Sequence, residues 1–307
     1  MERIAAQRWV ISSRDACCLR QQTELIQSQR SDPLCLCFDL RFANLRFPRK
    51  SGVPSVAKTH ARRVNVFTSS ASFPLFAMAS LFPQYSAVSS NFVSLFPDVG
   101  GGYFLPRLQG KLGLFLALTG FRLKGRDVLR AGVASHFVDS QKITALEKDL
   151  VNLKSPSFED VTGVLESYQT QSSVDKDKPF ILEQHMDAIN RLFEADSVEG
   201  IIDNLEQDGS SFAQKQAETL SKMSPTSMKL TFRQLRAGAG MSLKDVLVME
   251  YRLTQSCMRG QDFYEGVRAV LIDKDHSPVW SPSTLEGVTE AYLDDCFRPL
   301  GEQDLRL

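Results

Sequence analysis

Residues 95–110 read LFPDVGGGYFLPRLQG, and this stretch decides how the rest of the chain is interpreted. It sets one carboxylate, Asp98, among apolar neighbours, and three glycines follow at positions 100–102. Burial among such neighbours would raise the pKa of an acid, and glycines allow a backbone to approach a ligand closely. The same residues also suit a plainer role, in which Asp98 caps a helix and the glycines form a turn. The local chemistry leaves both interpretations open.

Four further motifs follow along the chain. They are LTG at 118–120, RAGV at 130–133, KMSPTS at 222–227 and MRGQDFYEGVRAVLIDK at 258–274. Together with FPDVGGG at 96–102, they resemble the crotonase (enoyl-CoA hydratase/isomerase) superfamily. The match is closer to the branch of that superfamily that hydrolyses 3-hydroxyisobutyryl-CoA. The resemblance covers about residues 95–300, the C-terminal two-thirds of the chain.

The resemblance implies a function and a site. The activity would be hydrolysis of 3-hydroxyisobutyryl-CoA to 3-hydroxyisobutyrate and CoA in valine breakdown, within the mitochondrion. No cofactor is expected, because CoA is part of the substrate. The resemblance makes Asp98 the catalytic acid and places Asp98 and Gly101 against the acyl-CoA. It also allows a phosphate contact from Arg268, although a solvated helix face is the favoured interpretation there.

The chain departs from the family pattern at one decisive position. The family has a second acid eight residues before the acid that matches Asp98, and here that position is Ser90. Gly52 is the only glycine before Gly100, so the glycine-containing loops that supply the family's oxyanion hole have no counterpart. Three interpretations follow: a hydrolase that relies on Asp98, a catalytically impaired chain or fragment that at most associates with intact subunits, or a hydratase or isomerase. The FPDVGGG motif favours the hydrolase branch over the third.

These observations predict the architecture. We expect an incomplete α/β crotonase-like fold, with a short βα spiral remnant followed by a mainly α-helical C-terminal region. Residues 1–94 are unassigned and expected to be poorly ordered, 95–150 would form a partial crotonase core, and 151–307 a helical region. Residues 133–138 read as a short strand, with His136 on it in a structural role. The acidic stretch 290–295 reads as a solvated end. Caps and apolar stripes predict helices at 112–119, 127–131, 158–168, 180–193, 197–207, 225–236, 243–257 and 262–272.

Composition narrows the possible partners. The chain has 307 residues, a formal net charge of zero and 43% hydrophobic residues. Zero net charge gives no support for a nucleic-acid or membrane-surface partner, and no uninterrupted apolar run is long enough to span a bilayer. Metal binding is not expected, because neither the six cysteines nor the four histidines have the spacing of a metal site. The histidines are scattered, at His60, His136, His185 and His276. Cys257 lies in an apolar helical pattern and is expected in the core. The oligomeric state is left open.

The N-terminal segment has a composition of its own. Residues 40–97 contain no Asp or Glu but many Arg and Ser, as organelle transit peptides do. The position is unusual, because acidic residues come first, at Glu2, Asp15, Glu24, Asp32 and Asp39. An extension without a targeting role therefore fits the segment better than a targeting signal does.

Overall fold

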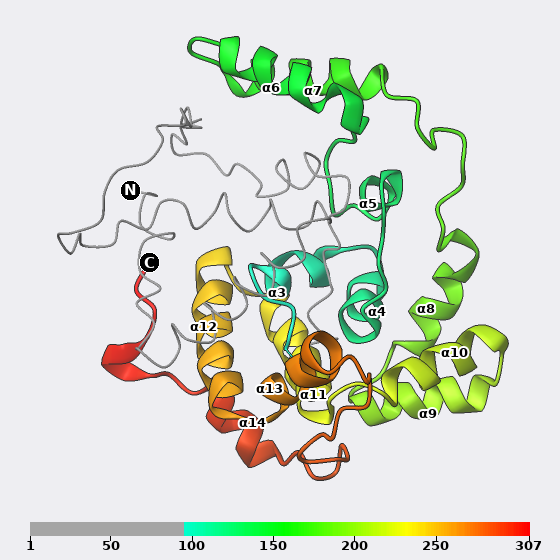
Figure 1. The fold of residues 1–307 in the computed structure, drawn as a ribbon, viewed down its shortest axis with the longest axis vertical. Coiled ribbons are helices and arrows are strands. Elements are labelled where there is room, and N and C mark those ends of the chain that lie inside the picture. The colour runs from blue at the N-terminus through cyan, green and yellow to red at the C-terminus, as the bar shows by residue number, and fades with distance from the viewer. Residues whose placement is uncertain (1–94) are drawn as a thin grey trace. The chain divides into compact units, whose positions relative to one another are not determined.

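The computed structural model describes residues 95–307, and these are mainly helical (Figure 1). No strand occurs among them. Short 3₁₀ segments lie at Leu105–Arg107, Ser140–Lys142, Glu183–His185 and Gly301–Gln303, and a π-helical turn at Arg268–Ile272. The α-helices are α3 Gly101–Phe104, α4 Leu112–Thr119, α5 Arg126–Arg130, α6 Ile143–Asn152, α7 Phe158–Thr170, α8 Met186–Leu192, α9 Val198–Asp208, α10 Ser211–Leu220, α11 Pro225–Gly238, α12 Leu243–Arg259, α13 Asp262–Val267 and α14 Glu290–Phe297.

Local capping explains where most helices begin and end. At α7 the capping box forms as predicted, because Ser157 Oγ accepts from the Asp160 amide at 3.1 Å and the Asp160 side chain accepts from the Ser157 amide at 2.9 Å. Serine also caps α9, α11 and α12, while left-handed Gly120 and Gly209 end α4 and α9. These signals are local, so the predicted bounds of those helices are confirmed to within about two residues.

Three predictions about local structure are wrong or incomplete. Residues 133–138 form an irregular connection, because Val133, Ala134 and Val138 pack against helices and have no neighbouring strand in the described region. The helix predicted at 180–193 begins only at α8, after a 3₁₀ turn. The acidic stretch from Glu290 is not a solvated end, because it forms α14 and buries Leu293 and Cys296. Helices α6 and α10 were also not predicted.

The apolar side chains of residues 95–307 gather in three clusters. The largest is formed by α4, α5, α8, α9, α10 and α11, with Phe115 completely buried against Phe193, whose ring centroid lies 5.4 Å away. The second joins α11, α12 and α14 and takes in Phe96, which is also fully buried. The third lies between α6 and α7, which run side by side as a hairpin (Figure 1). Helix α11 contributes to the first two clusters and therefore connects them.

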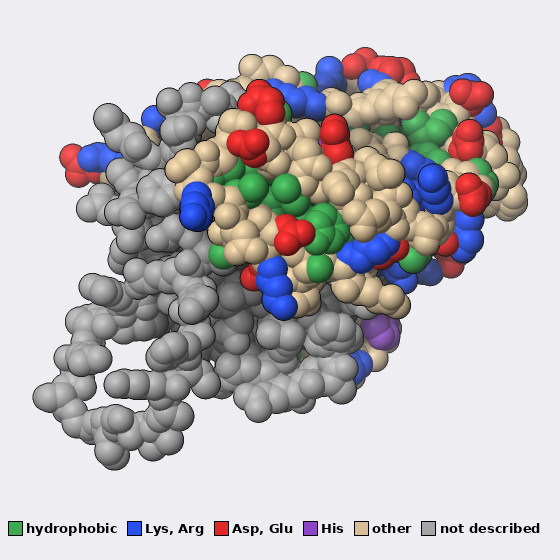
Figure 2. Space-filling view, turned by 90° about the horizontal axis from the view of Figure 1, so that it is seen from above, with side chains coloured by type: hydrophobic (Ala, Val, Ile, Leu, Met, Phe, Trp, Pro, Cys, Tyr) green, Lys and Arg blue, Asp and Glu red, His purple; other side chains and the backbone are tan. Residues whose placement is uncertain are grey.

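Hydrophobic side chains reach the surface in small groups. On the face shown in Figure 2 they lie between acidic and basic side chains, without one continuous apolar area. None of the helices in residues 95–307 is long and apolar enough to cross a membrane. The expected position of Cys257 is confirmed, since it is buried and free of disulfide bonding, and burial raises the pKa of its thiol to about 12.

The predicted division into an unassigned 1–94, a partial core at 95–150 and a helical region from 151 stays a prediction. Its first part lies outside the described residues. The described part, 95–307, contains helices on both sides of residue 150.

Candidate functional site

The Asp98 turn begins at a buried anchor and ends in a short helix. Phe96 fills the second core cluster, and residues 98–100 then form the turn that leads into α3. The Gly101 amide donates to the Asp98 carbonyl at 2.9 Å, closing the turn. Val99 and Gly100 both adopt left-handed backbone conformations, with φ of 56° and 87°. Such a φ is unusual for a β-branched residue, so Val99 is strained and the rest of the structure must hold it there.

Asp98 is exposed to solvent, so its predicted burial is wrong. The apolar neighbours divide between two environments, because Phe96 and Pro97 turn inward whereas Asp98 and Val99 lie on the outer side of the turn. The helix cap is Gly100, and no side chain caps α3, so the capping role is not realised either. The other half of that interpretation is confirmed only for Gly100, which lies in the turn, because Gly101 and Gly102 begin α3.

The glycine run is required by close packing as well as by backbone geometry. A Cβ at Gly101 would lie 2.7 Å from Cβ of Pro97, and one at Gly102 would lie 2.9 Å from Nε2 of Gln234. Gly238, at the end of α11, packs directly on the Gly102 carbonyl, which a Cβ at position 238 would approach to 2.0 Å. Both Gly101 and Gly102 are buried. The predicted contact of Gly101 with a substrate stays a prediction. The Gly101 amide itself donates within the turn.

A buried carboxylate, Glu250, holds this turn from the other side. Glu250 lies on α12 with 4% of its surface exposed, and its two oxygens accept from the Gly100 amide at 2.8 Å and the Gly102 amide at 2.9 Å. Burial raises its pKa to about 7, and the negative charge of Asp98 adds to that rise, while the amide hydrogen bonds oppose it. Glu250 is therefore a buried acid with a raised pKa.

Gln234 on α11 completes the cluster. Its Nε2 donates to the Pro97 carbonyl at 2.7 Å and to Glu250 Oε1 at 3.1 Å. Both acceptors need a donor, so the amide can be oriented in only one way. Its own oxygen is buried and has no hydrogen-bond partner among the described residues. Gln234 thus links α11 to both the start of the turn and Glu250.

Sequence reasoning missed Glu250, although one signal was present. The buried positions of α12 are Val246, Met249, Glu250, Leu253, Ser256 and Cys257. These recur at the three- and four-residue spacing of a helix face that packs inward. An acid on such a face is seldom buried without a partner, so its presence indicated a buried hydrogen-bonded carboxylate.

Arg107 binds the 3₁₀ turn that follows α3 to the neighbouring helices. Its guanidinium donates to the Gly238 carbonyl at 3.0 Å and the Met241 carbonyl at 2.9 Å, and it lies 3.8 Å from the centre of the Tyr103 ring. These carbonyls belong to the end of α11 and the connection to α12. The 3₁₀ turn after α3 is therefore tied to the same two helices that hold the glycines.

Gly238→Ala is expected to destabilise the protein by about 1–3 kcal/mol, because the new methyl group would overlap the Gly102 carbonyl. In an open helical position the same change would stabilise by up to ~1 kcal/mol. Gly240→Ala is the matched control, because no atom lies within 4 Å of its added Cβ. Urea unfolding of the two variants measures the difference. Equal midpoints would show that α11 does not press on the glycine run.

The remaining sequence-predicted residues lie elsewhere. Ser90 is outside the described residues, and so is His60. His136 lies in the irregular connection, its Nδ1 3.0 Å from Ser135 Oγ, rather than on a strand. Arg268 is held by Glu265 at 2.8 Å, Asp273 at 2.7 Å and Asp275 at 2.6 Å. Three carboxylates already satisfy this guanidinium, so it resembles a surface ion-pair network more than a free phosphate site.

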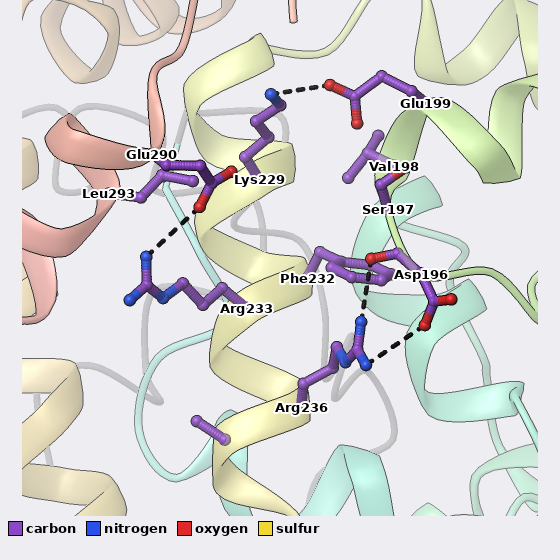
Figure 3. Close-up of a pocket in the computed structure, with 11 residues that line it drawn as sticks. Asp196, Ser197, Val198, Glu199, Lys229, Phe232, Arg233, Arg236, Glu290 and Leu293 are labelled. Carbon is purple, nitrogen blue, oxygen red and sulfur yellow. Dashed lines mark hydrogen bonds and ion pairs between the residues drawn. The ribbon is translucent and has the colours of Figure 1, made fainter.

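A separate hollow of about 690 Å³ lies between α11, the start of α9 and α14 (Figure 3). Three cations of α11 line it, and each faces a carboxylate: Lys229 with Glu199 at 2.7 Å, Arg233 with Glu290 at 3.7 Å, and Arg236 with Asp196 at 3.4 Å. Asp98 and Gly101 do not line it. The paired charges leave no excess of either sign for a charged ligand.

Comparison with known proteins identifies the family of this chain. The sequence model described as "Enoyl-CoA hydratase/isomerase" matches residues 84–297. The chain belongs to this family. Its curated relatives include proteins named "3-hydroxyisobutyryl-CoA hydrolase, mitochondrial" from Danio rerio, 68% identical over 221 residues, and from Homo sapiens, 64% identical over 220 residues. The match covers 72% of this chain but only 58% and 57% of those proteins.

Solved structures of the family give the fold. A carnitinyl-CoA dehydratase from Mycobacterium thermoresistibile superposes with a TM-score of 0.62 at 30% identity, over 72% of this chain and 60% of the other. An enoyl-CoA hydratase from Rhodobacter sphaeroides gives 0.59 at 30% identity, over 71% and 60%. The crotonase-like fold is therefore confirmed. The described residues are mainly helical and contain no strand, so the predicted βα spiral remnant is not found among them. The predicted resemblance to the hydrolase branch is confirmed.

Proposed function

We propose that this chain hydrolyses 3-hydroxyisobutyryl-CoA to 3-hydroxyisobutyrate and CoA, as in valine breakdown. The observation that carries the proposal is the 61–68% identity, over 72% of the chain, to relatives that bear the name of this hydrolase. The substrate is an acyl-CoA. The reaction needs water as its only other reactant, so no cofactor is proposed beyond the CoA of the substrate.

The geometry of the turn suits this chemistry. Water adds its oxygen to the thioester carbonyl carbon, the carbon–sulfur bond breaks, and the CoA sulfur leaves as the thiol after taking up a proton. A carboxylate that faces solvent can accept the proton of the attacking water, and Asp98 is such a group. It lies on a turn fixed by Phe96 on one side and Glu250 on the other, which limits the positions its carboxylate can take.

The position of Ser90 bears on the rate. A serine cannot replace the carboxylate that the family has there, so we propose slow hydrolysis that depends on Asp98 alone. An impaired chain that only associates with intact subunits is the alternative outcome of the assay. By the names of its relatives, the proposed location is the mitochondrion.

Two substrates distinguish the candidate reactions. Purified full-length chain is incubated with 3-hydroxyisobutyryl-CoA, and free thiol is measured with a colorimetric reagent. In parallel, crotonyl-CoA is offered, and loss of its enoyl absorbance reports hydration. We expect thiol release without loss of enoyl absorbance. Hydration without thiol release would show that the chain is a hydratase and not a hydrolase. If neither signal is seen, the remaining interpretation is the catalytically impaired chain.

A further inference from the structure

The bond between Glu250 and the glycine run has an unusual form. One carboxylate spans two amides, two residues apart, with a different oxygen on each. The partners lie 150 and 148 positions away in the sequence, at the start of another helix, α3. Gln234 then connects the same carboxylate to the carbonyl of Pro97, the residue just before Asp98. The residues before and after Asp98 are therefore both held by one hydrogen-bonded cluster.

The turn needs such an external support. Val99 and Gly100 occupy left-handed conformations, which persist only where surrounding structure enforces them. Helix α3 has four residues, too few to be stable by itself. Without the cluster, the backbone at Val99 could relax toward ordinary angles, and the exposed carboxylate of Asp98 would move with it. The place of Asp98 thus depends on Glu250, a residue that is itself buried.

We propose that Glu250, supported by Gln234, is the positioning residue for Asp98: by binding the amides of Gly100 and Gly102 it fixes the turn that carries the reactive carboxylate. The catalytic part of this inference rests on the proposed hydrolase function. The positional part does not, and it can be measured in the chain whether or not hydrolysis is observed.

Glu250→Gln is the informative variant because it keeps the shape of the side chain. Its amide nitrogen would face one of the two glycine amides, so at least one of the two hydrogen bonds from these amides is lost. We expect hydrogen exchange at Gly100 and Gly102 to become about 10-fold faster or more. We also expect the amide NMR signals of Asp98 and Val99 to shift. Glu250→Asp, one methylene shorter, gives a second variant should Glu250→Gln fail to fold.

Asp304→Asn is the matched control. Asp304 accepts from Arg252 Nε at 2.9 Å, so this change weakens an ion pair made by the same helix, α12, without touching the glycines. Faster exchange at the glycines in both variants alike would overturn the inference, because it would reflect general loosening of α12. Faster exchange and shifted Asp98 signals in the Glu250 variant alone would support it.

Kinetics separate positioning from simple stabilisation. Glu250→Gln should lower kcat for thiol release more than it raises KM, and it should have no further effect in an Asp98→Asn background. Equal losses with and without the Asp98 carboxylate would overturn the positioning role while leaving the hydrolase in place. If the wild-type chain releases no thiol, the proposed function fails, and the exchange and NMR measurements still decide the inference.

Discussion

Replacing Asp98 with Asn is expected to lower thiol release from 3-hydroxyisobutyryl-CoA by about 10²-fold or more. The substitution keeps the shape of the side chain but removes its basic oxygen, and positioned acid–base groups contribute ~10²–10⁴-fold to rates. Because Ser90 stands where the family has a second acid, no matching carboxylate can take over. For the same reason the wild-type rate should already lie roughly 10³-fold below that of a relative with both acids.

Asp160→Asn provides the control for this measurement. Asp160 is another exposed carboxylate at the start of a helix, in the capping box of α7, and the change in charge is identical. We expect its activity to equal that of the wild type. Thiol release that is unchanged in Asp98→Asn would remove Asp98 from the mechanism. A wild-type rate equal to that of an intact relative would show that Ser90 is not a deficit.

The second large effect is a pH dependence of stability that disappears in Glu250→Gln. The folded-state pKa of Glu250 is about 7 against an ordinary value of 4.5, so between these values the folded protein holds a proton that the unfolded chain has released. Raising the pH through this window therefore favours unfolding, by about 1.4 kcal/mol per pH unit and about 3 kcal/mol in total. The stability that protonated Glu250 contributes is complete below about pH 4.5 and is lost above about pH 7.

Urea unfolding across this range measures the effect. The free energy of unfolding of the wild type minus that of Glu250→Gln isolates the contribution of Glu250, because the other titrating groups are shared. Arg252 and Asp304 serve again as the control pair, and Asp304→Asn should leave the slope between pH 5 and 7 unchanged. A difference that is flat with pH would mean that Glu250 has its ordinary pKa in the folded protein, and one that rises would mean that its folded-state pKa is lowered.

Sequence and structure agree where a signal is local. Ser157 with Asp160, and Ser224 with Pro225, each specify a helix start within one turn of chain, and both starts are observed. The glycine run was recognised as a site of close backbone approach, and the approaching groups turned out to be Gln234 and Gly238. In these cases the residue type favours one local conformation, so the conformation can be predicted from a few neighbouring residues.

The failures concern contacts between distant segments. Burial of Asp98 was inferred from its neighbours in sequence. In the structure Phe96 packs in the core with α11 and α12, whereas Asp98 lies at the surface. Residues 133–138 have strand-like composition, yet no described strand is available to pair with them. The contact of Glu250 with Gly100 crosses 150 positions, and no local pattern specifies such a pair.

That separation has a consequence for the order in which the protein is made. The turn at Asp98 leaves the ribosome long before its support does, because 150 further residues must be joined before Glu250 exists. At about 5–20 residues per second, this delay is roughly 8–30 s. During this interval Val99 has no carboxylate to hold its strained backbone. The Asp98 turn is therefore completed only after 150 further residues have been joined, although its own residues are made much earlier.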